Sequence, residues 1–393
     1  MISPMVPMPA DDGGRLCILS MVRYLKGGGH EIHFVAPRTR ANDAAAFARE
    51  VSLHLIDLDP RSTIPGRLWH AFGPLPYAAQ KFFSERALNE IRDIAKKHRF
   101  DAIHVEHLYV MRFASALKRE LRLPLVLHEH NIETMILRHF ARNTRNPLVR
   151  LYARAECRKM HAFETAALRD CDLVFPVTAE DGGKLRQMAP ALNVVVLPHG
   201  VDTQRLRFSH CTVPERLLFL TNLDWLPNRE SFDYYTRDIH PALKSAVPGL
   251  RTLVVGKDLH RADRRNLPPD IEFRGFLPDL NEASSLASVA LVPLRIGSGI
   301  RVKILELMAM GITVVSTRLG AQGIHVRDGE HLLIADSPEE ITRAVKGLLA
   351  DPDRCRRIAV SARRFIEENH STEAFGSIVN DAYGSLLAAR RPG

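Results

Sequence analysis

Residues 293–311, PLRIGSGIRVKILELMAMG, carry the strongest signs of chemistry in the chain. An apolar run at 289–294 leads into a turn that holds Gly297 and Gly299, and a helical pattern follows at once. The first N–H groups of a helix have no partners within the helix, and the helix dipole is positive at that end. A strand–turn–helix junction of this kind can therefore hold a phosphate group.

Two cations, Arg301 and Lys303, stand in the first turn of that predicted helix. Like charge opposes the dipole there by about 0.3–1 kcal/mol for each cation. A purely structural helix gains nothing from this arrangement, whereas an anionic ligand would offset the repulsion. Glu306 lies near the same turn, and its carboxylate can accept hydrogen bonds from sugar hydroxyls. A phosphate-bearing ligand is therefore favoured over an ordinary strand–helix corner.

Short apolar strands alternate with helical stretches along the chain, which predicts an α/β fold of parallel sheets covered by helices. The strands expected in the first half lie at 31–36, 102–105, 125–128, 173–177 and 194–197, with helices at 16–25 and 87–97. Those expected in the second half lie at 217–220, 252–255, 272–273, 289–293, 313–316 and 332–334.

The strand at 194–197 runs into a Pro/Gly turn at 197–202, LPHGVD, which we interpret as the boundary between two domains. We expect a first Rossmann-like domain at 1–198, a second at 199–370, and a C-terminal helix at 371–393 that packs back on the first. Ligands of open parallel sheets bind beyond the carboxyl ends of the strands. The two domains are therefore expected to face each other across a cleft that holds the site.

The segment that begins at Glu306, ELMAMG followed by TVVST from Thr313, resembles the signature of the retaining glycosyltransferases of family four, also called group 1, which have the GT-B fold. Further stretches resemble motifs of the same family, namely DGGR at 12–15, HEHNIE at 128–133, LPHGVD at 197–202, DWLPN at 224–228 and GFLPD at 275–279. Each is weak by itself, but their order and spacing extend the resemblance over nearly the whole chain.

The resemblance implies three catalytic residues. Arg301 and Lys303 would stabilise the donor diphosphate as it leaves, the electrostatic help that this family uses in place of a metal ion. His130 falls at the position of the family's donor-sugar histidine, with a structural histidine as the alternative. The donor-binding residues implied are Glu306 for the ribose, together with Ser298, Gly299, Ile300, Gly13, Gly14, Gly275, Phe276 and Leu277. The nucleotide-sugar is then a substrate, and no metal or other cofactor is expected.

The sequence departs from the family pattern at three places. Ser298 stands eight residues before Glu306, where the family has a glutamate that touches the donor sugar, so the resemblance does not specify the donor sugar of this chain. TNLD at 221–224 stands where an arginine and a lysine are usual, and Arg301 and Lys303 are their natural substitutes. His199 replaces the usual asparagine of the turn between the domains.

The net charge of +9 over 393 residues is concentrated in the first half of the chain. Residues 1–198 hold 28 basic and 21 acidic side chains, a net of +7, and the remainder holds 26 and 24, a net of +2. A basic stripe in the first half comprises Arg138, Arg142, Arg150, Arg154, Arg158 and Lys159. Such a stripe either contacts an anionic membrane, at about 1 kcal/mol per charge, or forms a solvated helix face. Large aromatic side chains are few there, which disfavours nucleic acid as a partner.

Five cysteines without a C-x-x-C pair predict neither a disulfide framework nor a zinc site, which favours a reducing compartment. The sequence shows no signal-peptide pattern and no apolar run of about 18 residues. The expected location is cytoplasmic, either free or peripheral at the inner membrane face. The Asp-x-Asp strings at 57–59, 170–172 and 351–353 are interpreted as surface patterns rather than metal sites.

We therefore expect an enzyme that transfers a sugar from a nucleotide-sugar donor to a lipid-linked or polysaccharide acceptor in cell-envelope glycan synthesis. A soluble small-molecule acceptor is one alternative, and a non-catalytic GT-B scaffold that binds nucleotide-sugar is another. A dinucleotide-dependent oxidoreductase is disfavoured, because GSGIRV at 297–302 lacks the third glycine of G-x-G-x-x-G. No acidic residue stands about 20 residues downstream to hold a ribose.

Overall fold

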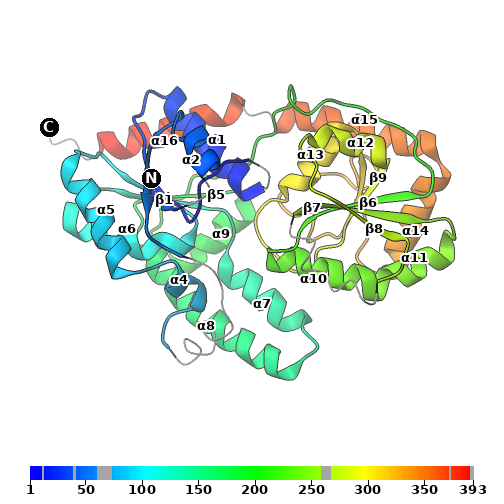
Figure 1. Ribbon diagram of the computed structural model, residues 1–393, viewed down its shortest axis with the longest axis horizontal. Coiled ribbons are helices and arrows are strands. Elements are labelled where there is room, and N and C mark those ends of the chain that lie inside the picture. The colour runs from blue at the N-terminus through cyan, green and yellow to red at the C-terminus, as the bar shows by residue number, and fades with distance from the viewer. Residues whose placement is uncertain (11–12, 39–40, 60–72, 258–266, 371–372, 390–393) are drawn as a thin grey trace. The chain divides into compact units, whose positions relative to one another are not determined.

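The computed structural model describes residues 1–10, 13–38, 41–59, 73–257, 267–370 and 373–389 (Figure 1). The chain divides into two compact units. The first unit comprises Met1–His199 together with Glu373–Gly393, and the second comprises Gly200–Thr372. Within the described residues, no helix is both long and apolar enough to cross a membrane.

The first unit is built around parallel strands. Its strands are β1 (His33–Pro37), β2 (Ser52–Ile56), β3 (Ile103–Glu106), β4 (Leu125–Glu129) and β5 (Leu173–Pro176). They form one pair, β1–β2, and one sheet of order β3–β4–β5. Ile2 makes parallel bridges to both Val35 and Val105, so residues next to the start of the chain lie between β1 and β3.

Helices connect these strands, as right-handed crossovers between parallel strands require. They are α1 (Gly13–Gly27), α2 (Ala41–Phe47), α4 (Tyr77–Lys81), α5 (Glu85–Lys97), η1 (Leu108–Val110), α6 (Met111–Leu121), α7 (Glu133–Asn143), α8 (Pro147–Asp170), α9 (Ala179–Met188) and α16 (Glu373–Ala388). The final helix, α16, packs against α1, and its Phe375, Val379 and Tyr383 join the apolar cluster of α1. The C-terminal segment therefore completes the core of the first unit.

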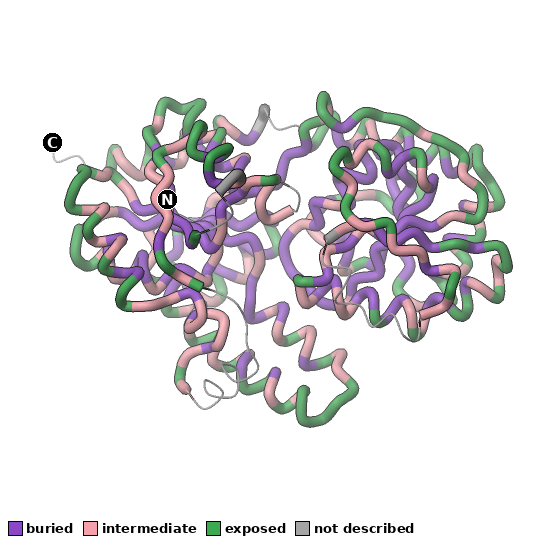
Figure 2. The backbone as a smooth tube through the Cα atoms, viewed as in Figure 1, coloured by how far each residue is buried: buried purple, intermediate pink, exposed green. Residues whose placement is uncertain are grey.

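Both faces of the first sheet are buried, which explains why β4 is a continuous apolar run. Leu125 and Leu127 belong to one apolar cluster, and Val126 belongs to the cluster on the opposite face. Successive strand residues point to opposite faces, so helices must cover both sides. Figure 2 shows the same arrangement, with buried backbone along the strands and exposed backbone on the outer helices.

The second unit contains one six-stranded parallel sheet of order β11–β10–β9–β6–β7–β8. Its strands are β6 (Arg216–Asn222), β7 (Arg251–Lys257), β8 (Ile271–Gly275), β9 (Val289–Val292), β10 (Thr313–Ser316) and β11 (Leu333–Ile334). Its helices are α10 (Leu226–Tyr234), η2 (Tyr235–Ile239), α11 (His240–Ala246), η5 (Leu280–Glu282), α12 (Ala283–Leu286), α13 (Val302–Met310), α14 (Pro338–Ala350) and α15 (Pro352–Asn369). The order reverses between β6 and β9, and ligands of open α/β sheets bind at such a reversal.

The predicted fold class is confirmed, because both units are built from parallel strands with apolar clusters on both faces. One predicted strand is wrong: residues 194–197 form only a single bridge, Val174 to Val194, beside β5. The backbone N–H groups of Val195 and Leu197 still donate to carbonyls of β5, so the segment follows the sheet edge without forming a regular ladder.

Candidate functional site

The loop between β9 and α13 has a backbone that requires glycine. Gly297 has a φ of 148° and Gly299 a φ of 73°, both in the region that other residues rarely adopt. A Cβ atom at Gly297 would lie 2.8 Å from the Nη2 atom of Arg301. The glycines therefore let the loop wrap closely around the guanidinium of Arg301.

Arg301 is the N-cap residue of α13, and only 3% of its surface is exposed. Its Nη1 atom donates to the carbonyls of Ser298 and Gly299, and its Nη2 atom donates to the carbonyl of Leu319, at 3.2 Å, in the turn after β10. Because a trans peptide carries its C=O and N–H on opposite sides, these bonds direct the N–H groups of Gly299 and Ile300 away from the guanidinium. Arg301 thus fixes the orientation of two backbone donors at the start of a helix.

Lys303 occupies the first turn of α13 and reaches toward β6. Its Nζ atom donates to the carbonyl of Leu220, at 3.1 Å, and to the side-chain oxygen of Asn228, at 2.8 Å. Burial and the nearby charge of Arg301 lower the pKa of Lys303 from 10.5 to about 7. Lys303 therefore sits at the strand-order reversal with a charge that neutral oxygens compensate only in part, which is an arrangement suited to an anion.

The remaining predicted donor residues of α13 and its loop lie on the same continuous segment. Ser298 is buried and contributes a carbonyl to Arg301, while Ile300 packs on the apolar core. Glu306 is 9% exposed, and its Oε1 atom lies 3.9 Å from the Nη2 atom of Arg205. The structure thus brings Ser298, Gly299, Ile300, Arg301, Lys303 and Glu306 together around one helix N-terminus.

The loop Gly275–Leu277 follows β8 at the edge of the same sheet. Gly275 has a φ of 80°, Leu277 packs on the core, and Phe276 is 46% exposed. Because β8 and β9 are parallel members of one sheet with β6 and β7 between them, their carboxyl ends lie about 14 Å apart on the same side of the sheet, at 4.8 Å per strand. This loop and the loop that leads to α13 both leave the sheet on that side. An exposed aromatic ring at that edge is suited to stacking on a base.

His130 follows β4 in the first unit and belongs to a buried cluster centred on Glu106. The carboxylate of Glu106 bonds the Nε2 atom of His130 at 2.7 Å, Nδ1 of His128 at 3.0 Å and Nε2 of His104 at 3.0 Å. Glu106 ends β3 and pairs in register with His128 on β4, so strand register brings these groups together. The ring of His107 packs against that of His130 at a tilt of 33°, with the ring centroids 3.8 Å apart.

The cluster places the carboxylate of Glu106 among three imidazoles that bond to it. Burial alone would raise the pKa of Glu106, but His128 and the three imidazole hydrogen bonds hold that pKa well below its usual range. Burial and the neighbouring His128 lower the pKa of His130 to about 4, so this ring is neutral at physiological pH. A neutral ring that donates from Nε2 to Glu106 has its tautomer fixed by that bond.

The glycines of the first loop lie in the first turn of α1, which begins at Gly13 with Gly14 next to it. Asp12 of the same motif lies outside the described residues. His199, the unusual residue of the Pro/Gly turn, contacts the Sγ atom of Cys17 on α1 through its Nδ1 atom, at 3.2 Å. The imidazole therefore ties the turn to α1.

Two groups of side chains in the described part of the chain have ligand atoms within 4.8 Å of one another, as a metal site requires. One comprises His104, Glu106 and His128, whose nitrogens already bond the Glu106 carboxylate. The other comprises His33, His54 and His98, where the Nδ1 atom of His33 lies 3.0 Å from Nε2 of His54. The expectation of a metal-independent reaction stays a prediction.

The sequence analysis missed Asn228, Glu106 and Arg205 as site residues. Asn228 lies within the DWLPN stretch, so that motif was a usable signal for it. Glu106 stands directly at the end of a predicted strand, beside the strand that leads to His130. Carboxyl ends of neighbouring parallel strands meet at one edge, and this rule could have drawn attention to the pair.

Two family models match the chain. The model described as Glycosyltransferase Family 4 matches residues 12–205, and the model described as Glycosyl transferases group 1 matches residues 214–351. An uncharacterized 44.6 kDa protein in the cps region of Klebsiella pneumoniae is 21% identical over 397 residues, covering 97% of this chain and 98% of its own. The lipopolysaccharide core biosynthesis mannosyltransferase LpcC of Rhizobium leguminosarum bv. viciae is 27% identical over 281 residues, covering 65% of this chain and 76% of its own.

Solved structures share the fold over nearly the entire chain. Sucrose-phosphate synthase from Thermosynechococcus elongatus superposes with a TM-score of 0.75 at 18% identity, covering 99% of this chain and 98% of its own. HepE from Anabaena, in complex with UDP-glucose, superposes with a TM-score of 0.70 at 14% identity, covering 98% of both chains.

Proposed function

Because the chain belongs to the group 1 glycosyltransferases of family 4, which have the GT-B fold, we propose that it moves a sugar from a nucleotide-sugar to a lipid-linked or polysaccharide acceptor in cell-envelope glycan synthesis. The observation that carries this proposal is the pair of cations at the N-terminus of α13, the buried Arg301 and the half-buried Lys303. Lys303 has a pKa of about 7 and lies beside Arg301 at the strand-order reversal. A donor diphosphate would supply the negative charge that this arrangement lacks.

The proposed roles follow from the geometry of the second unit. Lys303 neutralises the diphosphate as it leaves with the nucleotide. Arg301 adds positive charge from the side of the loop that carries the carbonyls of Ser298 and Gly299. The N–H groups that Arg301 orients, on Gly299 and Ile300, donate to phosphate oxygens. Ser298 belongs to the same donor loop. Glu306 accepts hydrogen bonds from the ribose hydroxyls.

Two further segments are proposed to contact the donor. Gly275, Phe276 and Leu277 contact the base, and the Phe276 side chain is partly exposed to solvent. Gly13 and Gly14 offer backbone N–H groups from the first turn of α1. The family resemblance further implies retention of anomeric configuration, with the donor phosphate taking the proton of the acceptor hydroxyl.

His130 is proposed to contact the donor sugar as a neutral imidazole. Its pKa of about 4 means that it neither carries charge nor changes protonation state near pH 7. It therefore acts as a hydrogen-bonding group rather than as a general acid. Glu106 fixes its tautomer and so acts as a positioning residue.

The proposed acceptor class is supported by relatives and by the surface of the first unit. One relative lies in the cps region of Klebsiella pneumoniae and another acts in lipopolysaccharide core biosynthesis. In the hairpin of α7 and α8, Leu148 is 77% exposed and Leu151 is 67% exposed. Both lie on α8 near Arg150 and Arg154 of the basic stripe. Exposed apolar side chains among arginines suit an anionic membrane surface, so we propose a cytoplasmic enzyme with peripheral contact at the inner face.

Assays of donor turnover test this proposal. With UDP-glucose, GDP-mannose or dTDP-glucose, wild-type protein should release the nucleoside diphosphate in the presence of extracted envelope glycan or lipid. Arg301→Ala should lower kcat by a factor of about 10²–10³. Arg301→Lys keeps the charge but loses the forked contact with two carbonyls, so its kcat should lie between those of the wild type and Arg301→Ala. Arg356→Ala, on an exposed part of α15, is the control. Turnover by Arg301→Ala at the wild-type rate, or binding of donor without turnover by wild type, would contradict the proposal.

A further inference from the structure

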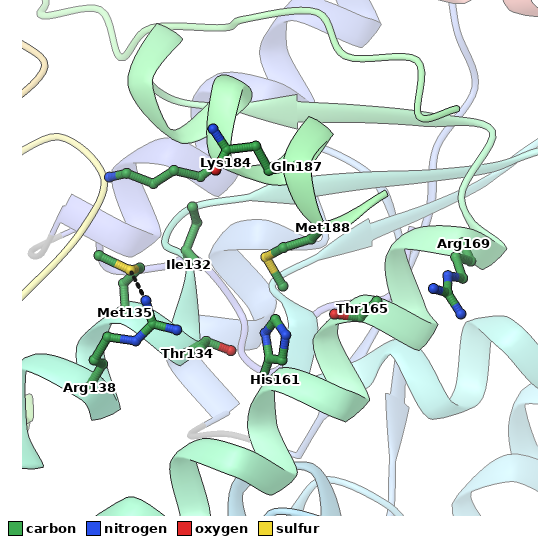
Figure 3. A pocket seen from close by; sticks show the side chains of 10 residues that line it. All are labelled: Ile132, Thr134, Met135, Arg138, His161, Thr165, Arg169, Lys184, Gln187 and Met188. Atoms are coloured by element: carbon green, nitrogen blue, oxygen red, sulfur yellow. Dashed lines mark hydrogen bonds between the residues drawn. The ribbon is translucent and has the colours of Figure 1, made fainter. Parts of the chain in front are cut away.

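A pocket of about 450 Å³ lies among α7, α8 and α9 of the first unit. Figure 3 shows the side chains that line it, which are Ile132, Thr134, Met135, Arg138, His161, Thr165, Arg169, Lys184, Gln187 and Met188. Its volume suits a small group or chain segment of a larger ligand rather than a single water molecule. None of the residues described above as donor-binding or catalytic lines it.

The lining combines an apolar part with a cationic part. Ile132, Met135 and Met188 supply the apolar surface. Three cations come from three different helices: Arg138 from α7, Arg169 from α8 and Lys184 from α9. Of the ten lining residues in the described part of the chain, none is acidic, although the Nζ atom of Lys184 lies 3.5 Å from a carboxylate oxygen of Asp181 outside the lining. The pocket is therefore electropositive and half apolar.

The pocket walls are held in place by a side chain that joins α7 to α8. The carboxylate of Glu164, on α8, accepts from the backbone N–H of Glu133 at 2.7 Å and from that of Thr134 at 3.2 Å. These two N–H groups have no acceptor within α7, because they belong to its first turn. Glu164 of α8 therefore caps the N-terminus of α7 and holds the two helices together. Ile132 lines the pocket and lies in the same turn after β4 as His130, two residues further along the chain. The pocket is therefore next to the segment that carries a candidate catalytic residue.

We propose that this pocket binds an anionic group of the acceptor, a phosphate or a carboxylate attached to an apolar or sugar chain. The inference rests on the proposed function, since it names the chemical class of acceptor that this glycosyltransferase uses. Arg138 and Lys184, which Figure 3 shows on the same side of the pocket, pair with the anion. The methionines and Ile132 contact the attached chain, because flexible thioethers adapt to irregular apolar ligands.

Binding of three hexyl probes to the full chain tests the pocket directly. Hexyl phosphate carries the phosphate, hexyl β-glucuronide the carboxylate, and hexyl β-glucoside no charge. Calorimetry should show at least tenfold tighter binding for one of the anionic probes than for the glucoside, and the tighter of the two identifies the anion. Equal affinity for all three, or no binding of either anionic probe, would overturn the proposal.

Substitutions of the lining residues test whether the anion binds in this pocket. Arg138→Gln and Lys184→Gln should each weaken the preferred probe at least fivefold, and Arg142→Gln, on the same helix but outside the lining, should not. With the natural acceptor extract, Arg138→Gln should raise the acceptor KM and leave the donor KM unchanged. Wild-type affinity in both pocket variants would overturn the site. Failure of wild type to bind any nucleotide-sugar while the anionic probe still binds would sink the proposed function and leave the pocket standing.

Discussion

The lowered pKa of Lys303 predicts that donor affinity falls as the pH rises above neutrality. The free protein holds this lysine at a pKa of about 7, between two neutral oxygens and next to the charge of Arg301. A bound diphosphate favours the charged form and returns the pKa toward 10.5, so binding takes up a proton whenever the free lysine is neutral.

The magnitude follows from the protonated fraction of the free protein. With a pKa of about 7, Lys303 is about 90% charged at pH 6, about 50% at pH 7 and about 1% at pH 9. If only the charged form binds, the dissociation constant rises about 50-fold between pH 7 and pH 9. Proton uptake on binding should be about half a proton at pH 7 and nearly one at pH 8.5.

Calorimetric titration with a nucleotide-sugar measures both quantities. The diphosphate of a nucleotide-sugar is a diester without a titrating proton in this range, whereas a free nucleoside diphosphate would add its own ionisation. Buffers with different heats of ionisation report the proton uptake. Lys303→Met should bind weakly at every pH and take up no proton, and Lys346→Met, on α14, serves as the matched control. Wild-type affinity that stays constant from pH 6 to pH 9, without proton uptake, would refute the reasoning.

Three further predictions concern stability and surface contact. Lys303→Met should raise the free energy of unfolding more at pH 6 than at pH 9, as measured by urea titration. The pKa of Lys303 in the folded protein lies below its value in the unfolded chain, so burying the charged lysine destabilises the fold fully below pH 7. This destabilisation decreases as the pH rises from about 7 toward 10.5. Glu106→Gln should lower the free energy of unfolding by about 1–3 kcal/mol, because three imidazoles lose a charged acceptor, and should lower kcat with little change in donor affinity. The double change Leu148→Asp and Leu151→Asp should reduce co-sedimentation with anionic vesicles while leaving the melting temperature unchanged, because both side chains are exposed.

Each of these predictions has an outcome that would contradict it. An equal effect of Lys303→Met on the free energy of unfolding at both pH values would show that the charged lysine does not destabilise the folded protein. A Glu106→Gln protein with wild-type stability and kcat would mean that the cluster does not position His130. For the hairpin, Val360→Asp on α15 is the control, being 50% exposed on another element, and equal vesicle binding by all variants would remove the membrane contact.

The fold and the α13 segment could be predicted because their signals are local. Gly297, Gly299, Arg301 and Lys303 stand within a few residues of one another, and the strand–turn–helix pattern alone places them at a helix N-terminus. The partners of Lys303 could not be predicted in this way. Asn228 is 75 positions away, and only the packing of α10 against the end of β6 brings its side chain to the lysine. The low pKa depends on that packing.

Strand register limited the prediction in the first unit. Glu106 lies opposite His128 because β3 and β4 pair in one particular register, and a shift of one residue would point the side chain to the other face. The sequence shows histidines on two strands but not which carboxylate they share. The strand expected at 194–197 failed for a related reason: an apolar run at a sheet edge can follow its neighbour with a few hydrogen bonds and still not form a ladder.

Burial lowers the pKa of both His130 and Lys303, yet the two shifts have different consequences for catalysis. The pKa of His130 falls from 6.5 to about 4, so the ring is already neutral throughout the range in which the protein would work. The pKa of Lys303 falls to about 7, within that range, and a bound anion reverses the shift. Of these two residues, Lys303 is therefore the one expected to lower activity as the pH rises through 7 and beyond. Substituting His130 should change the height of the pH profile while leaving the position of its descending limb where it is.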